Sequence, residues 1–207
     1  MNKYLDNKFS ILLLGFLCLL CKSAYTSEKI LIFGDSLSSG YGISIEDSWP
    51  ELLTKKIKKR KSILSVINRS ISGETTSGGI RRLPKLLSKI SPHIVIIELG
   101  ANDALRGLPL SQTKKNLKKM VELSKRNGAK PLIIGMRIPP NYGKAYSEKF
   151  FNIFKQVAYE KKIAIVPFMF EGFAENRDYF LADQIHPNEK AQRKILENIW
   201  EELEPLI

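Results

Sequence analysis

The residues whose types and spacing could carry chemistry lie near the two ends of this 207-residue chain. Near the N-terminal end, Ser36 directly follows an apolar run and a Gly-Asp dipeptide, and near the C-terminal end Asp183 precedes His186 by three positions. A serine hydroxyl becomes an effective nucleophile only beside a base. An aspartate that accepts a hydrogen bond from an imidazole fixes the tautomer that such a base needs. These residues therefore predict a nucleophile, a base and an orienting acid.

Each of these motifs also has an ordinary structural explanation. Serine is common in turns and at helix caps, and Asp183 and His186 could cap the helix that the following residues predict. The chain has a second histidine, His93, which begins an apolar strand pattern at the end opposite the predicted site. We interpret His93 as structural, so His186 is the candidate base.

Acyl transfer also needs hydrogen-bond donors for the charge that develops on the carbonyl oxygen. Asn102 follows the third predicted strand, and its side-chain amide is one candidate donor. Gly73 follows the second predicted strand, and its backbone N–H is another candidate, with the N–H of Ser36 as a third. On the residues alone, Gly73 and Asn102 could equally belong to ordinary turns.

The elements that must position these residues alternate between apolar strand patterns and amphipathic helical patterns. The predicted strands are Lys29–Phe33, Ser65–Asn68, His93–Leu99, Leu132–Met136 and Ile163–Val166. The predicted helices are Ser48–Lys59, Thr76–Lys89 with a kink or break at Pro84, Ser111–Asn127 with a stop at Gly128, Ser147–Lys161, and Asn188 to Leu203. Continuously apolar strands indicate a parallel sheet covered on both faces, which is a three-layer α/β sandwich. Ligands bind at the carboxyl ends of such strands, where the loops carrying the candidate residues begin.

The N-terminus has the pattern of a secretory signal peptide. Two lysines precede an uncharged apolar run, 11–21, which is too short to span a membrane, and small residues follow it. This pattern predicts a cleaved signal over residues 1–26, one domain over residues 27–207, and a periplasmic or secreted location. An uncleaved anchor and a lipid on Cys21 are the alternatives. Both cysteines, Cys18 and Cys21, would leave with the signal.

The formal charge of +12 comes from lysines scattered along the chain and gathered in runs such as 55–61 and 114–119. Both runs lie on amphipathic helical patterns, and we interpret them as solvated helix faces. Attraction to an anionic membrane surface is the alternative. The basic residues match no nucleic-acid motif and are not interleaved with aromatic residues, so nucleic acid is not an expected partner. No metal, no cofactor and a monomeric chain are expected.

Together the motifs resemble the four sequence blocks of the GDSL/SGNH hydrolases. The blocks occur in the family's order as Gly34-Asp35-Ser36-Leu37, Gly73, Gly100-Ala101-Asn102-Asp103, and Asp183 with His186. Further segments resemble the periplasmic branch known for thioesterase, arylesterase and lysophospholipase activities: 68–73, 105–107, 140–143 and 185–188. The resemblance covers Lys29 to Leu206. One departure is Ala101, where that branch often has glycine.

The resemblance implies a flavodoxin-like, five-stranded parallel sheet in the order 2-1-3-4-5. It implies that Ser36 is the nucleophile, His186 the base and Asp183 its orienting acid. The oxyanion hole would consist of the Ser36 N–H, the Gly73 N–H and the Asn102 amide. The implied function is an exported serine hydrolase that cleaves carboxylic ester or thioester bonds of acyl substrates, including lysophospholipids, through an acyl-enzyme.

Substrate preference is less constrained by the sequence. An acyl-chain channel is predicted from four apolar loop residues, which could instead serve core or loop packing: Leu105, Leu108, Ile138 and Tyr142. A carbohydrate O-acetyl esterase of the same fold, with a short polar pocket, is the alternative within the class. From other classes, a nucleotide binder lacks the required glycine spacing. A catalytically dead binding module would fail to react with a fluorophosphonate.

Overall fold

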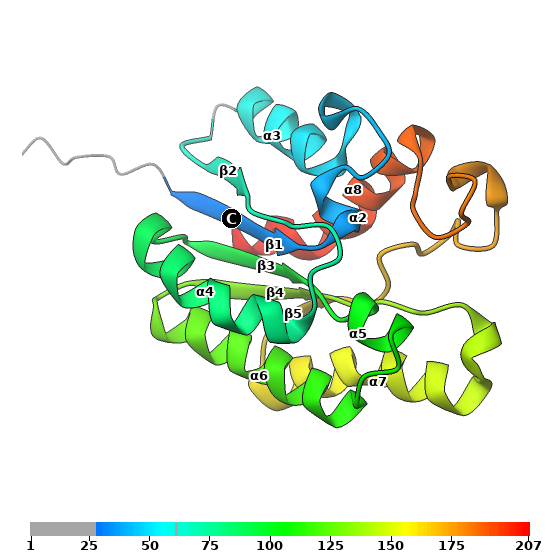
Figure 1. Ribbon diagram of the computed structural model, residues 1–207. Helices are drawn as coiled ribbons and strands as arrows, with labels where there is room; N and C mark the ends of the chain where they lie inside the picture. Colours follow the sequence, from blue (N-terminus) through cyan, green and yellow to red (C-terminus); the bar gives the residue numbers. More distant parts are fainter. Residues whose placement is uncertain (1–27, 61) are drawn as a thin grey trace, which may run out of the picture.

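The computed structural model describes residues 28–60 and 62–207, in which strands and helices alternate along the chain (Figure 1). The strands are β1 (Lys29–Gly34), β2 (Ser65–Asn68), β3 (Ile94–Glu98), β4 (Lys130–Ile134) and β5 (Ala164–Val166). The helices are α2 (Ser36–Ser39), α3 (Trp49–Lys59), α4 (Thr76–Ile90), α5 (Ala101–Leu105), α6 (Leu110–Arg126), α7 (Lys144–Lys161) and α8 (Glu189–Leu203).

All five strands are parallel and lie in the order β2-β1-β3-β4-β5. Figure 1 shows α3 and α8 on one face of the sheet and α4, α6 and α7 on the other. The predicted three-layer fold and strand order are therefore confirmed. The central strand β3 is buried along its whole length, which explains its uninterrupted apolar run, because helices cover both of its faces.

The fourth strand begins two residues earlier than the sequence predicts. Pairing with β3 decides the boundary, because Lys130 lies opposite Ile94 and its N–H donates to the His93 carbonyl at 2.8 Å. Lys130 and Pro131 are poor strand formers by themselves, so local propensity places the start too late. His93 itself precedes β3 at the amino edge of the sheet, opposite the loop that carries Ser36.

Two predicted helix interruptions have different outcomes. The break at Pro84 is wrong, because α4 is continuous from Thr76 to Ile90, whereas the alternative, a kink, stays a prediction. Its buried face, which includes Leu83 and Leu87, packs into the core and offsets the local cost of the proline. The helix stop at Gly128 is confirmed, since α6 ends at Arg126 and Gly128, with φ = 81°, directly follows the C-cap Asn127.

The predicted signal peptide, residues 1–26, lies outside the described residues. Within the part of the chain that the structure describes, no helix has the length and apolar character needed to cross a membrane. The division between a cleaved signal and a domain over residues 27–207 therefore stays a prediction.

Candidate active site

The carboxyl ends of three neighbouring strands bring the candidate residues to one edge of the sheet. β1 leads into the turn that carries Ser36, β2 leads toward Gly73, and β3 leads into α5 with Asn102. Because β1 lies between β2 and β3, the Ser36 turn is flanked by the other two loops (Figure 1). The hydroxyls of Ser39 and Ser72, 2.8 Å apart, join the first two loops.

His186 lies between Ser36 and Asp183 and contacts both. Its Nε2 is 2.9 Å from the Ser36 Oγ, and its Nδ1 is 2.7 Å from Oδ2 of Asp183. The His186 side chain is 19% exposed, so a small substrate can reach the site while the ring remains held. With the proton on Nδ1, the free Nε2 lone pair faces the serine hydroxyl, as a general base requires.

The turn from Asp183 to His186 is organised by the aspartate itself. Its Oδ1 accepts from the backbone N–H groups of Ile185 (2.9 Å) and His186 (3.0 Å). Desolvation acts to raise the pKa of Asp183, but hydrogen bonds from the His186 backbone and ring and from the Ile185 backbone outweigh it and lower the pKa. The carboxylate is thus held ionised. Gln184 completes the turn in the left-handed region, at φ = 58°.

The loop that carries His186 is held by backbone hydrogen bonds and by an aromatic contact to the His186 ring. The His186 carbonyl accepts from the Leu181 N–H at 2.8 Å, and the Asn188 N–H donates to the Tyr179 carbonyl at 2.9 Å. Asn188 also caps α8, which begins at the next residue. The Tyr41 ring lies against the imidazole, with the two ring centroids 4.4 Å apart. These contacts limit the positions that the imidazole can adopt.

The three candidate oxyanion donors surround the Ser36 turn. The Asn102 Nδ2 donates one hydrogen to Oδ2 of Asp35 at 2.8 Å, which leaves its second hydrogen for a ligand. The backbone N–H groups of Ser36 and Gly73 donate to no other residue that the structure describes. Gly73 has φ = 75°, a conformation that favours glycine, and the Arg106 guanidinium donates to its carbonyl at 3.0 Å.

A buried carboxylate joins the loop after β2 to the loop after β3. Asp103, the neighbour of Asn102, is 2% exposed and accepts from the Thr76 backbone N–H at 2.8 Å and from the Thr76 hydroxyl. Thr76 begins α4, directly after the Gly73 loop. The Gly73 and Asn102 loops, two of the three that supply candidate oxyanion donors, are therefore joined by one side chain.

The four predicted channel residues differ in their exposure. Ile138 is buried in the core, and Leu105 is half-buried against it. Leu108 is 37% exposed and Tyr142 is 41% exposed, so both are open to a ligand. The Tyr142 hydroxyl donates to the Leu105 carbonyl at 3.3 Å, which places these two residues together. The acyl channel stays a prediction.

Four residues that contact the site carry too little sequence signal to receive a role: Asp35, Tyr41, Glu98 and Arg106. Asp35 stands inside the Gly-Asp-Ser-Leu motif, and Glu98 is a charged residue that ends an otherwise apolar run. That break in hydropathy is the one available signal for Glu98. Tyr41 and Arg106 lie in polar loops, where a tyrosine or an arginine is unremarkable without the fold.

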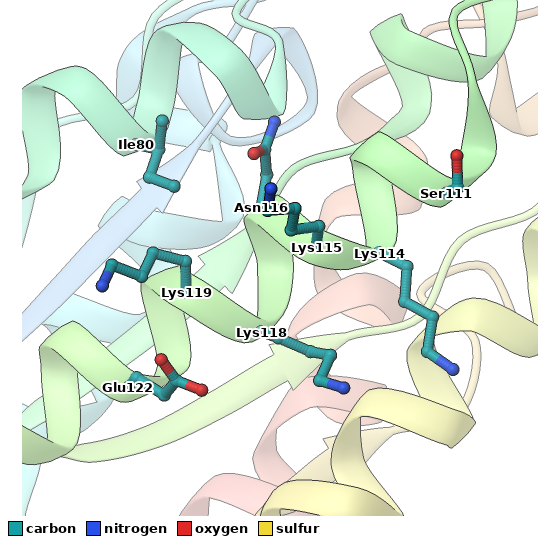
Figure 2. Close-up of a pocket in the computed structure, with 8 residues that line it drawn as sticks. All are labelled: Ile80, Ser111, Lys114, Lys115, Asn116, Lys118, Lys119 and Glu122. Atoms are coloured by element: carbon teal, nitrogen blue, oxygen red, sulfur yellow. The ribbon is translucent and has the colours of Figure 1, made fainter.

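The lysine run 114–119 lines a separate hollow of about 620 Å³ on α6, shown in Figure 2. Two of its lysines are paired, because Lys114 and Lys118 lie 2.8 and 2.6 Å from Glu160 of α7. Hydrogen bonds from these lysines lower the Glu160 pKa to about 2. The hollow contains no candidate catalytic residue. Across residues 28–60 and 62–207, no group of three or more His, Cys, Asp or Glu side chains could hold a metal ion.

A family model of the GDSL-like lipase/acylhydrolase family matches residues 32–194. This chain belongs to that family. The matched segment contains the Ser36 turn, both flanking loops and the Asp183–His186 turn, so the family's sequence pattern and the geometry converge on the same sheet edge.

The relatives of this family member include an arylesterase from Vibrio mimicus, 43% identical over 93% of this chain and 98% of the relative. The thioesterase 1/protease 1/lysophospholipase L1 of Escherichia coli K12 is 40% identical over 93% of this chain and 91% of its own length. Among solved structures, the crystal structure of TesA is 42% identical and superposes with a TM-score of 0.85 over 87% of this chain and 100% of TesA.

Proposed function

We propose that this GDSL-like hydrolase is an exported enzyme that cleaves carboxylic ester or thioester bonds of acyl substrates through an acyl-enzyme on Ser36. The observation that carries the proposal is the position of His186, with one ring nitrogen against the serine hydroxyl and the other against an ionised aspartate. The names of the relatives, which include arylesterase, thioesterase and lysophospholipase, support the same reaction class.

In the first step, the Ser36 Oγ attacks the substrate carbonyl carbon while Nε2 of His186 takes the hydroxyl proton. Asp183 stabilises the imidazolium that forms and keeps its ring oriented. His186 then gives the proton to the departing alcohol or thiol, which leaves an ester between the acyl group and Ser36. A water molecule, activated by the same imidazole, releases the acid in the second half of the cycle.

During each half of the cycle the carbonyl oxygen acquires negative charge. The backbone N–H groups of Ser36 and Gly73 and the second amide hydrogen of Asn102 would donate to this oxygen. Fixed donors of this kind stabilise the transition state more than the ground state, because they need no reorganisation when the charge appears.

The proposed substrates carry an acyl chain, and a lysophospholipid is one such molecule. The exposed Leu108 and Tyr142 support this proposal, since both are open to an apolar ligand beside the oxyanion loops. Each fully buried CH₂ contributes about 0.8 kcal/mol, so kcat/KM should rise by up to about 15-fold for every two carbons until the channel is full. A chain-length series of p-nitrophenyl esters and acyl-CoA thioesters measures this dependence. A preference for acetyl over octanoyl esters would instead favour the carbohydrate O-acetyl esterase.

The proposed location is periplasmic or secreted, and it rests on the signal-peptide pattern of residues 1–26. Weak contact with an anionic membrane surface is proposed from the basic charge, with the exposed lysines of α6 as candidates. Attraction of this type is screened over about 10 Å at 0.1 M salt. Hydrolysis of lysophospholipid in anionic vesicles should therefore slow as salt is added, whereas hydrolysis of a neutral soluble ester should not.

Labelling with a fluorophosphonate tests the nucleophile directly. Mass spectrometry should locate the adduct on Ser36, and Ser36→Ala should abolish both labelling and turnover while the circular dichroism spectrum is retained. The control variant is Ser39→Ala, which removes a neighbouring hydroxyl of the same turn. The fluorophosphonate should still label Ser36 in this variant. An adduct on another residue, or turnover by Ser36→Ala at the wild-type rate, would refute the proposal.

A further inference from the structure

Two carboxyl groups lie buried side by side directly beneath the Ser36 turn. Asp35 is 0% exposed and Glu98 is 1% exposed. The Glu98 Oε2 accepts from the Asp35 backbone N–H at 3.2 Å and from the Ser38 hydroxyl at 2.7 Å. The contact is tight, because a Cβ placed on Gly34 would lie 2.5 Å from the same Glu98 oxygen. Glu98 thus contacts Asp35 and Ser38, which lie on either side of Ser36 in the nucleophile turn.

No described cation forms an ion pair with either carboxyl group. The charged or titratable groups that act on Asp35 are Glu98, Asp103 and, when protonated, His186. Two adjacent buried carboxylates without a cation would cost several kcal/mol, so such a pair retains a proton. Burial, and then the neighbouring Asp35, raise the pKa of Glu98 well above its ordinary value.

The hydrogen bonds around Asp35 favour its ionised form. Its Oδ1 accepts from the Leu37 N–H at 3.1 Å, and its Oδ2 accepts from the Asn102 amide at 2.8 Å. Burial raises the pKa of Asp35 to about 6, and these two donors act against that increase. Glu98 is therefore the member of the pair that keeps the proton near neutral pH.

We propose that Glu98 and Asp35 form a proton-sharing carboxyl pair, in which protonated Glu98 supports an ionised Asp35 that holds the Asn102 amide in the oxyanion position. Both are positioning residues, since neither reaches the substrate. Asp35 fixes one amide hydrogen of Asn102, and this orients the other toward the carbonyl oxygen. The catalytic part of this inference rests on the proposed function, whereas the shared proton can be detected without it.

Infrared spectroscopy at about pH 7 tests the proton itself, because exposed carboxyl groups are ionised there. The wild-type protein should show the C=O stretching band of a protonated carboxylic acid, and Glu98→Gln should lack it. Ser36→Ala should keep the band even though it is inactive, which separates failure of this inference from failure of the proposed function. Absence of the band in the wild type, or its survival in Glu98→Gln, would overturn the proposal.

Kinetics of two variants test the positioning role. Glu98→Gln replaces a neutral acid with a neutral amide, so the acid-side inflection in the pH profile of kcat/KM should move by less than about half a pH unit. A shift of this inflection to a much lower pH would show that the substitution removes a negative charge. Glu98 would then be ionised in the wild type, which contradicts the shared proton.

Asp35→Asn keeps an oxygen that can cap α2 through the Leu37 N–H, but it presents an amide donor to the Asn102 amide. Its kcat should fall about 10²-fold with little change in KM, and Asp35→Asn should add less than about threefold to the loss already caused by Asn102→Ala. Additive losses would show that Asp35 does not act through Asn102. If Asp35→Asn does not fold, the infrared band of the wild-type protein decides whether the carboxyl pair holds a proton.

Discussion

Replacement of Asn102 by alanine is the sharpest test of the oxyanion site. Of three candidate donors, the substitution removes the side-chain amide and leaves the backbone N–H groups of Ser36 and Gly73 in place. Loss of one such donor lowers kcat by about 10²–10³-fold, which corresponds to roughly 2.7–4 kcal/mol of transition-state stabilisation. KM should change far less, because the second amide hydrogen of Asn102 acts on charge that develops only during the reaction.

The same substitution also affects stability, and this effect has to be separated from catalysis. Asp35 is fully buried and loses the donor that lies 2.8 Å from its Oδ2, which costs about 1–3 kcal/mol. Asn198→Ala is a matched control. Asn198 lies on α8, and its half-buried side-chain amide donates to the Met169 and Glu171 carbonyls, each at 3.1 Å. It should lower the free energy of unfolding by a similar amount while kcat stays near wild type.

Steady-state kinetics on a p-nitrophenyl ester give kcat and KM for both variants, and chemical denaturation gives their free energies of unfolding. An increase in KM with unchanged kcat in Asn102→Ala would refute the oxyanion role and leave Asn102 as a substrate-binding residue. Equal losses of kcat in Asn102→Ala and Asn198→Ala would also refute it, since the effect would then follow stability.

Three further predictions concern the triad and the mature chain. Asp183→Asn should lower kcat by between about 10²- and 10⁴-fold, because the amide no longer favours the tautomer that leaves Nε2 free; a loss below tenfold in kinetic assays would contradict the orienting role. The kcat/KM of the wild type should decrease as the pH falls through about 6, because Asp35, with its pKa of about 6, then loses the charge that holds the Asn102 amide. Protonation of His186 acts in the same direction, since the imidazolium cannot accept the serine proton. A profile that is flat down to about pH 5 would exclude this. Intact-mass analysis of exported protein should show a chain that starts near Ser27 and has no thiol, and a mature chain that retains Cys21 would contradict signal cleavage.

The candidate site was accessible from the sequence wherever local chemistry fixes a residue's place. Ser36, Gly73 and Asn102 each follow an apolar strand run, and the carboxyl ends of parallel strands necessarily share one edge of the sheet. The Asp183–His186 turn closes within four residues, so its hydrogen bonds are a local property. The central strand runs can be recognised in the sequence because burial on both faces favours apolar residues at nearly every position.

Long-range packing decided the rest. The contact between Ser36 and His186 joins residues 150 positions apart, and no local pattern measures that distance. The start of β4 at Lys130 depends on pairing with β3, and the continuity of α4 through Pro84 depends on the core beneath it. The hydropathy of a glutamate predicts exposure, yet Glu98 is buried. Only the tertiary structure shows that it lies against Asp35, so that the pair keeps a proton.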